Sequence, residues 1–484
     1  MRHTSGVLRR LTEKHGPLSV FVEYPVLIQL GIICTCAEMA WATLLVVMQF
    51  YFKEELLVGD TPQQITAHVA QAMFAFVAAE TLFKYPMGHL ADRYGVRRFV
   101  LFALGLCTIT PLLARFCHVW WEFIPLRAMD GLAAAALWPS MSALMARSVP
   151  RDAKASAMSV FNGAYMFGIA VGPLTGLKIG QLVGTDSAVF PMCAVLMGVG
   201  FITAYKAIPH HVEHAADDME SFSEDRHMLD GRPMLAKMLF LYASAQLGIG
   251  VLGPTLPVYL QEHFGLVQAN LAKPLALPAL LIAVAAIPLG RVADHIGRAL
   301  AVWISYGMAT AGVLLISLSS MYHPDHHPYS VPLKIFLAGG LLLVLSYIVG
   351  TPAWLGLTSL QVDDRSQGKV LSLMQTAQGF GVVAALGIVG CGAAIMAWQA
   401  RVDMRFHRVM SHLHHHPQPL VLALPSKLHD TVPLSVWFWG STFVYFLVFV
   451  GSVLWVREPA HLEEGGADRA GTPGSGAPAP ELAP

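Results

Sequence analysis

Long apolar runs dominate this chain of 484 residues and limit what it can fold into. Hydrophobic residues make up 55% of the chain and charged residues 13%, against roughly 25% charged in soluble domains. A helix of about 20 apolar residues crosses the hydrocarbon core of a bilayer. We therefore expect an all-α membrane protein with twelve transmembrane helices, at 24–50, 66–90, 97–116, 119–147, 156–182, 187–207, 234–260, 270–291, 299–320, 332–358, 368–398 and 434–456.

A polar, acidic stretch between the sixth and seventh runs divides the chain into two halves. We expect a cytoplasmic N-terminal segment at 1–23, a six-helix bundle at 24–207 and a cytoplasmic linker at 208–233. A second six-helix bundle should follow at 234–456. The remaining segment, 457–484, is rich in Pro, Gly, Ala and Glu, and this composition predicts a disordered cytoplasmic tail.

Basic residues predict the orientation of the helices in the membrane. They gather in alternate loops, at positions such as Arg97, Arg151 and Arg298, and the intervening short loops hold few. Because cytoplasmic loops carry the excess of Lys and Arg, both termini should be cytoplasmic. The loop between the last two runs, with Arg401 and Arg405, departs from this rule. We expect a multi-pass protein of the bacterial inner membrane.

A short basic loop follows the second run and returns in weaker form after the eighth. Repeats of this kind are typical of transporters built from two related bundles. The first copy holds Gly88, Asp92, Arg93, Gly95, Arg97 and Arg98, and the second holds Gly290, Asp294, Gly297 and Arg298. This pattern resembles the signature loop of the major facilitator superfamily, and the resemblance implies two pseudo-symmetric six-helix bundles.

The resemblance also implies a role for this loop as a conformational latch on the cytoplasmic side. In the family, the glycine allows close helix packing and the aspartate interacts with the dipole of a neighbouring helix. Gly88 would then be the packing glycine and Asp92 the latch acid, with the three arginines as its charge partners. His295 and Ala299 replace basic residues in the second copy, so the latch there should be weaker. The alternative is that the arginines only set topology.

Three charged residues inside the first bundle are candidates for proton coupling. Arg127 and Asp130 open the fourth run in a segment that resembles a second motif of the family, with Asp130 in place of its usual glutamine. Residues three apart share a helix face, and an arginine in the membrane costs about 2.5–3.5 kcal/mol or more. The two should pair, either as a coupling device or as a static structural pair. Glu38, near the middle of the first run, is the third candidate, with structural pairing as its alternative reading.

Four residues of the fifth run, Gly168, Gly172, Pro173 and Gly176, resemble a motif of the antiporter branch of the superfamily. Small residues four apart let membrane helices pack closely, and proline bends a helix. Leu177 stands where that motif has its last glycine. The pattern favours export over uptake, although packing alone would also explain it.

The presumed spans of the second half offer polar but uncharged residues as candidates for the substrate cavity: Gln246, Gln375 and Gln378. Histidines gather in two loops, around His326 and His414. We interpret both loops as solvated polar segments and assign no metal site and no cofactor.

These features together predict a secondary active transporter for proton-coupled efflux of small amphipathic compounds by alternating access. Its partners would be a small-molecule substrate, protons and the lipid bilayer, and the chain should act as a monomer. The zero net charge gives no sign of nucleic-acid binding. The sequence shows no phosphate-binding loop, which counts against a nucleotide-driven pump, and no nucleophile–base set that would indicate an enzyme. Two alternatives stay open: uptake of a nutrient or metal chelate by symport or facilitated diffusion, and a non-transporting membrane sensor.

Overall fold

Helices make up most of the structure of this protein, which is a computed structural model. The structure describes residues 24–60, 62–148, 154–209, 232–266, 296–322, 331–359, 361, 370, 373–392 and 434–457. Several predicted features lie outside these ranges. They are the N-terminal segment 1–23, the predicted span 270–291 with Gly290, the latch acid Asp294, both histidine loops, and nearly all of the linker and tail.

The first half contains six long helices, and short helical turns flank three of them. The π-helix η1 (Phe52–Leu56) continues α3, and the 3-10 turns η2 (Trp120–Glu122) and η4 (Asp186–Ala188) precede α6 and α8. The long helices are α3 (Val26–Tyr51), α4 (Pro62–Tyr94), α5 (Val96–Ala114), α6 (Phe123–Arg147), α7 (Lys154–Val183) and α8 (Val189–Ala207).

The second half has five long helices within its described residues: α9 (Pro233–Phe264), α12 (Arg298–Ser319), α13 (Val331–Ser359), the helix Leu373–Gly392 and α15 (Ser435–Trp455). Ten helices of the described chain are long and apolar enough to cross a membrane, and α6, which carries Arg127 and Asp130, is not among them. The protein is thus an all-α, multi-pass membrane protein. Apart from 270–291, each predicted span overlaps one of the eleven long helices named above, α6 included.

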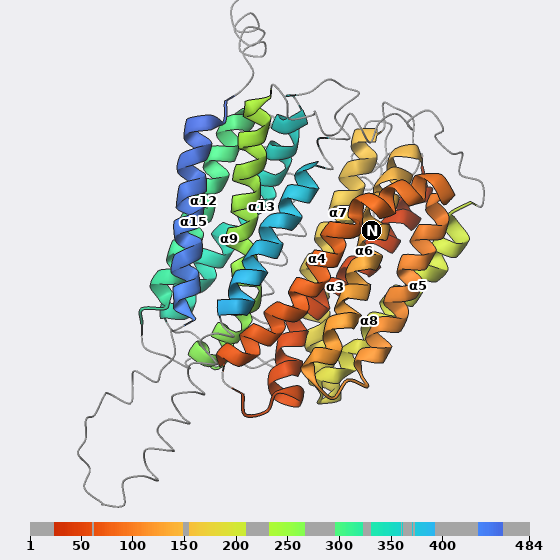
Figure 1. Ribbon diagram of the computed structural model, residues 1–484, viewed down its shortest axis with the longest axis horizontal. Coiled ribbons are helices and arrows are strands. Elements are labelled where there is room, and N and C mark those ends of the chain that lie inside the picture. The colour runs from red at the N-terminus through yellow and green to blue at the C-terminus, as the bar shows by residue number, and fades with distance from the viewer. Residues whose placement is uncertain are drawn as a thin grey trace, which may run out of the picture.

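The helices form two groups that stand side by side (Figure 1). In the first group, α3 packs against both α7 and α8, α5 lies between α6 and α8, and α4 packs on α6. In the second, α12 packs on α13 and α15, and α15 packs on α9.

The two groups meet along α4, α9 and the helix Leu373–Gly392. Ala70, Val251, Ala385 and Val389 form a small buried apolar cluster there, with one residue from α4 and three from the second half. A Cβ atom on Gly379 would lie 2.2 Å from the hydroxyl oxygen of Thr81, so the glycine permits a close crossing with α4.

Polar contacts join the two halves where α3 and α9 end. Lys53 forms an ion pair with Glu262, and the Gln261 amide nitrogen donates to Glu54 over 3.4 Å. One turn deeper, Gln49 donates to the Gly253 carbonyl over 3.1 Å. We call this region the Lys53 end, and in this conformation it is held closed by contacts between the halves.

The repeated loops share one backbone geometry. Gly95 has φ 98° and ψ 123° and directly precedes α5, and Gly297 has φ 91° and ψ 138° and directly precedes α12. Glycine adopts this positive-φ conformation at little steric cost, which other residues do not. The two-fold repeat in the sequence is therefore also a repeat in the backbone.

Candidate functional site

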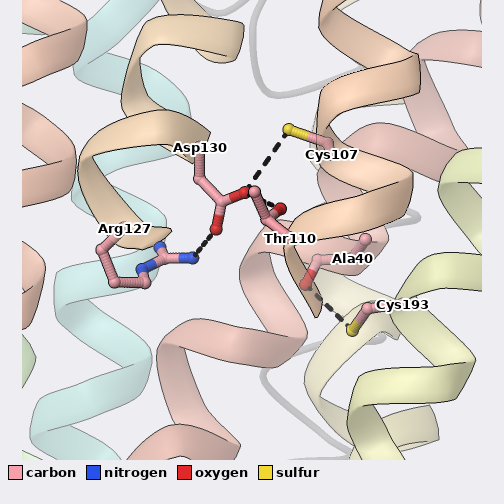
Figure 2. Close-up of polar contacts among 6 residues, drawn as sticks. All are labelled: Ala40, Cys107, Thr110, Arg127, Asp130 and Cys193. Carbon is pink, nitrogen blue, oxygen red and sulfur yellow. Dashed lines mark hydrogen bonds and ion pairs between the residues drawn. The ribbon is translucent and has the colours of Figure 1, made fainter. Parts of the chain in front are cut away.

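A buried ion pair lies in the first group of helices. Arg127 Nη1 and Asp130 Oδ2 are 2.7 Å apart, and the two side chains are only 7% and 5% exposed. Both come from α6 at a spacing of three residues, which places them on one helix face. The predicted pair is therefore present (Figure 2).

Neighbouring helices complete the environment of this pair. The second carboxylate oxygen, Oδ1, accepts hydrogen bonds from the Thr110 hydroxyl and from the Cys107 thiol, 3.7 Å away, both on α5 (Figure 2). The guanidinium carbon of Arg127 lies 4.6 Å from the centre of the Phe76 ring on α4, at the distance of a cation–π contact. Since a buried charge is costly unless it is paired and hydrogen-bonded, these contacts offset part of the cost of burying the two groups.

Close helix packing brings α4 to the pair. A Cβ atom on Gly131 would lie 2.1 Å from the Phe76 carbonyl oxygen, so α4 and α6 touch at this glycine. The Arg127 Nε atom is buried and has no hydrogen-bond partner among the described residues. The guanidinium thus keeps one donor free within the bundle.

Glu38 lies on α3 and is 8% exposed. Within the described part of the chain, no hydrogen bond or ion pair involves its carboxylate. Tyr165 of α7 and Tyr347 of α13 both lie within range of an electrostatic interaction with it, so this acid influences residues of both halves. Glu80, the other acid nearby, is paired with Lys84 at 2.9 Å. Glu38 is therefore the acid of this region that lacks a cationic partner in the structure described.

The glycines of α7 form the surface on which α3 rests. A Cβ atom on Gly168 would lie 2.6 Å from Glu38 Cβ, one on Gly172 would lie 2.5 Å from the Met39 carbonyl oxygen, and one on Gly176 would lie 2.3 Å from a Thr43 methyl. Pro173 sits within the same helix. This glycine face sets the depth at which Glu38 sits in the bundle.

The latch residues that the structure describes make contacts within their own halves. Arg97 is buried and donates to the Tyr205 carbonyl of α8 over 2.9 Å, with its guanidinium 5.2 Å from the Tyr205 ring centre. Arg298 donates to the Gly356 carbonyl of α13 over 3.2 Å. Gly88 faces Pro139 of α6 with room for a methyl group, since a Cβ atom there would lie 3.7 Å away.

The other latch residues make few contacts among the described residues. Arg93 and Arg98 are exposed, and Arg93 lies over the Tyr94 ring at 5.4 Å. Asp92 lies in the last turn of α4, and its side chain is outside the described set. The pairing of Asp92 with the three arginines remains a prediction.

Two of the three predicted cavity glutamines share one neighbour. Gln246 of α9 lines a pocket of about 40 Å³ in the second half, together with Tyr242 one turn earlier. The Tyr242 hydroxyl donates to Gln378 Oε1 over 3.4 Å. Gln375 is exposed on the same helix as Gln378.

Several residues of the site were not predicted from the sequence. Thr110, Cys107 and Phe76 contact the ion pair from other helices, and nothing in their local sequence signals it. The pocket residues of α13 carry a detectable signal, because Tyr347, Thr351 and Trp354 recur at helical spacing within an otherwise apolar run. A search for polar faces on apolar helices would have found them.

The fold and this site define a multi-pass integral membrane protein with an Arg–Asp pair buried between its helices. Residues 30–386 match the family model of the Major Facilitator Superfamily, and the chain belongs to that superfamily. This confirms the family to which the repeated loop pointed.

Among curated proteins, the chain is similar to several named multidrug resistance protein MdtG. The protein from Rahnella sp. is 31% identical over 217 residues, which are 43% of this chain and 52% of that protein. The protein from Yersinia enterocolitica is 27% identical over 216 residues, 43% of this chain and 51% of that protein. The chain thus spans about half the length of these relatives.

Solved structures share the fold at low sequence identity. A mutant of the nucleoside transporter NupG superposes with a TM-score of 0.67 at 10% identity, over 89% of this chain and 100% of that chain. A bacterial homologue of the human lysosomal transporter Spinster, in an inward-facing and unoccupied conformation, gives a TM-score of 0.62 at 13% identity, over 90% and 98%. At these identities the likeness concerns the fold alone.

Proposed function

We propose that this protein is a secondary active transporter that exports small amphipathic compounds in exchange for protons, by alternating access. Family membership supports transport, and the similarity to proteins named for multidrug resistance supports export. The observation that supports proton coupling is that the first bundle buries two acids, Asp130 and Glu38, with different sets of partners. Asp130 has a full set of partners, whereas the buried carboxylate of Glu38 has no cationic partner among the described residues.

In the proposed cycle, a proton that arrives from outside neutralises Glu38 or Asp130. A neutral Asp130 no longer balances Arg127, so the guanidinium and the helices that it joins become free to rearrange. Since α3 rests on the glycine face of α7, a change at Glu38 acts directly on the packing of two helices. The membrane potential contributes about 2.3 kcal/mol per charge per 100 mV, in addition to the pH gradient.

The contacts at the Lys53 end are proposed to be the ones that open and close. Lys53 and Glu262 belong to different halves and are 30% and 41% exposed. An ion pair so exposed contributes about 0–1 kcal/mol, so it stabilises a closed end without locking it. We assign this end to the outer side of a bacterial inner membrane, with both termini cytoplasmic, and the latch around Gly88, Asp92 and Gly95 to the inner side.

The proposal also covers the domain boundaries, the oligomeric state and the orientation of the chain in the membrane. We place the bundles at 24–207 and 234–456, joined by the linker 208–233, and propose that the chain works as a monomer in the bilayer. Fusion of a reporter that fluoresces only in the cytoplasm to each terminus tests the orientation, and both fusions should fluoresce.

An export assay in cells tests the proposed function. Cells that overproduce the protein are loaded with a fluorescent amphipathic dye and then energised. They should expel the dye faster than cells with an empty vector, and a protonophore should abolish the difference. Glu38→Gln should remove it as well, whereas Glu122→Gln, the same charge change in the 3-10 turn η2, should not. Faster dye uptake would support import, and unchanged cellular activity with Glu38→Gln would support a sensor.

A further inference from the structure

The pocket in the second half carries an inference that rests on the proposed function and makes it more specific. We propose that this pocket is a recognition subsite for a neutral hydrogen-bonding group, such as a carboxamide or hydroxyl, carried on an aromatic ring of the substrate. It is lined by residues that include Tyr242, Gln246, Tyr347, Thr351, Trp354 and Tyr445. All the lining residues are uncharged.

Helical periodicity on α13 builds one wall of the pocket. Tyr347, Thr351 and Trp354 lie at spacings of four and three residues, so they share one face of α13. That face is polar and aromatic within a helix that is otherwise strongly apolar. Because polar groups in a membrane helix cost free energy unless they have partners or a function, this face indicates a site rather than a lipid contact.

Tyr445 of α15 lines the pocket from another helix. The residue is 4% exposed, and no hydrogen bond of its hydroxyl occurs within the described part of the chain. Its ring packs against Gly248 of α9, where a Cβ atom would lie 2.9 Å from the Tyr445 ring. The glycine therefore makes room for the ring to reach the pocket. The hydroxyl of this lining residue is able to form a hydrogen bond with a ligand in the pocket.

Several hydroxyl groups converge on the same space. Tyr242, Tyr306 and Tyr347 each lie within range of an electrostatic interaction with Tyr445. The Trp354 indole nitrogen donates to the Tyr306 hydroxyl, which fixes the orientation of both rings. Phenol hydroxyls both donate and accept, so the cluster suits a neutral group that does the same.

The absence of charge in the lining decides which ligands are excluded. An ionised group loses its hydration on entering a pocket, and no charged side chain lines this one to replace it. A neutral amide or hydroxyl loses less and regains its hydrogen bonds. The volume of about 40 Å³ holds three or four water molecules at roughly 10–15 Å³ each, so it accepts the polar end group of a ring compound rather than a whole multi-ring molecule.

Tyr347 connects the pocket to the charged interior of the first half. It lines the pocket and lies within electrostatic range of Glu38 across the two halves. Recognition of a neutral group would thus occur beside the proposed coupling acid, on different residues. The two roles are therefore separable by substitution.

Three small compounds of the same shape test the proposal: benzamide, which is neutral, benzoate, which is negative, and benzamidine, which is positive. Binding to the purified full-length protein is followed by saturation-transfer NMR titration, which does not depend on transport. Benzamide should bind at least about tenfold more tightly than either charged analogue. Tyr445→Phe, which removes only the hydroxyl, should weaken benzamide binding by roughly two- to tenfold, the range for loss of one neutral hydrogen bond.

Tyr259→Phe is the matched control, because Tyr259 is also buried in the second half, at 5% exposure, and does not line the pocket. It should leave benzamide binding unchanged. Equal or tighter binding of a charged analogue, or equal effects of the two Tyr→Phe variants, would overturn the proposal. If benzamide binds as expected but the dye assay shows no proton-dependent export, the subsite stands and the proposed function is rejected. If export is proton-dependent and Tyr445→Phe does not change benzamide binding, only the subsite is rejected.

Discussion

Gly168 of α7 and Glu38 of α3 are in direct contact, so that a methyl group on the glycine would lie 2.6 Å from Glu38 Cβ. The glycine that allows the two helices to pack thus also fixes the position of the proposed coupling acid. Helix packing, which was the alternative reading of the glycine motif, and the proposed coupling acid therefore meet at one contact.

Gly168→Ala should therefore destabilise the protein and impair coupling together. The added methyl group has to push α3 away from α7, and overpacking of this kind costs about 1–3 kcal/mol. Thermal melting in detergent should show a lower transition temperature, and proton-dependent export should fall. Gly163→Ala is the control on the same helix, since nothing lies within 4 Å of its Cβ position. A melting temperature that falls equally for both variants would contradict this account.

The ion pair of α6 should respond to substitution as a unit. Asp130→Asn leaves Arg127 buried without its counter-charge, and breaking a buried pair costs about 3–5 kcal/mol. Replacing both residues, as in Arg127→Met with Asp130→Leu, removes both charges and should recover most of the lost stability. Melting experiments measure the stability, and the double variant should remain inactive in proton-coupled export. Export by the stable double variant would show that the pair is only structural.

Local patterns predicted the parts of this fold that depend on neighbouring residues in the sequence. The apolar runs predicted the helices, the repeated loop predicted the family, and a spacing of three residues predicted the Arg127–Asp130 pair. Contacts between distant segments were beyond such patterns. Thr110 reaches Asp130 from another helix, and Tyr347 of the other half comes within electrostatic range of Glu38, because helix rotation and packing decide which faces meet.

The Lys53–Glu262 pair should influence which end of the molecule is closed. Lys53→Glu places two acids together at the Lys53 end and should favour its opening, whereas Lys53→Glu with Glu262→Lys should restore closure. Spin labels on Val58 and Met321, both exposed at this end and in different halves, report the distance by double electron–electron resonance. The long-distance population should grow up to about fivefold in the single variant, as expected for a pair worth about 1 kcal/mol. An unchanged distance distribution would remove the pair from the proposed gate.

Gly95→Ala and Gly297→Ala should each destabilise the protein by about 1–3 kcal/mol, because both positions have a positive φ that a Cβ atom strains. Thermal melting measures the loss. Gly440→Ala, in α15 with nothing within 4 Å of its Cβ position, should not lower stability. Tolerance of alanine at either loop glycine would indicate that this backbone geometry is not required there.

Proton movement across a membrane that contains only this protein is the most direct test of coupled export. The purified protein is placed in proteoliposomes with an acidic interior and a trapped pH-sensitive dye, and amphipathic compounds are added outside. Antiport predicts that a transported compound makes the interior pH rise, that Glu38→Gln and Asp130→Asn abolish the rise, and that Glu122→Gln preserves it. Accumulation of labelled compounds without any change in interior pH would contradict proton-coupled exchange.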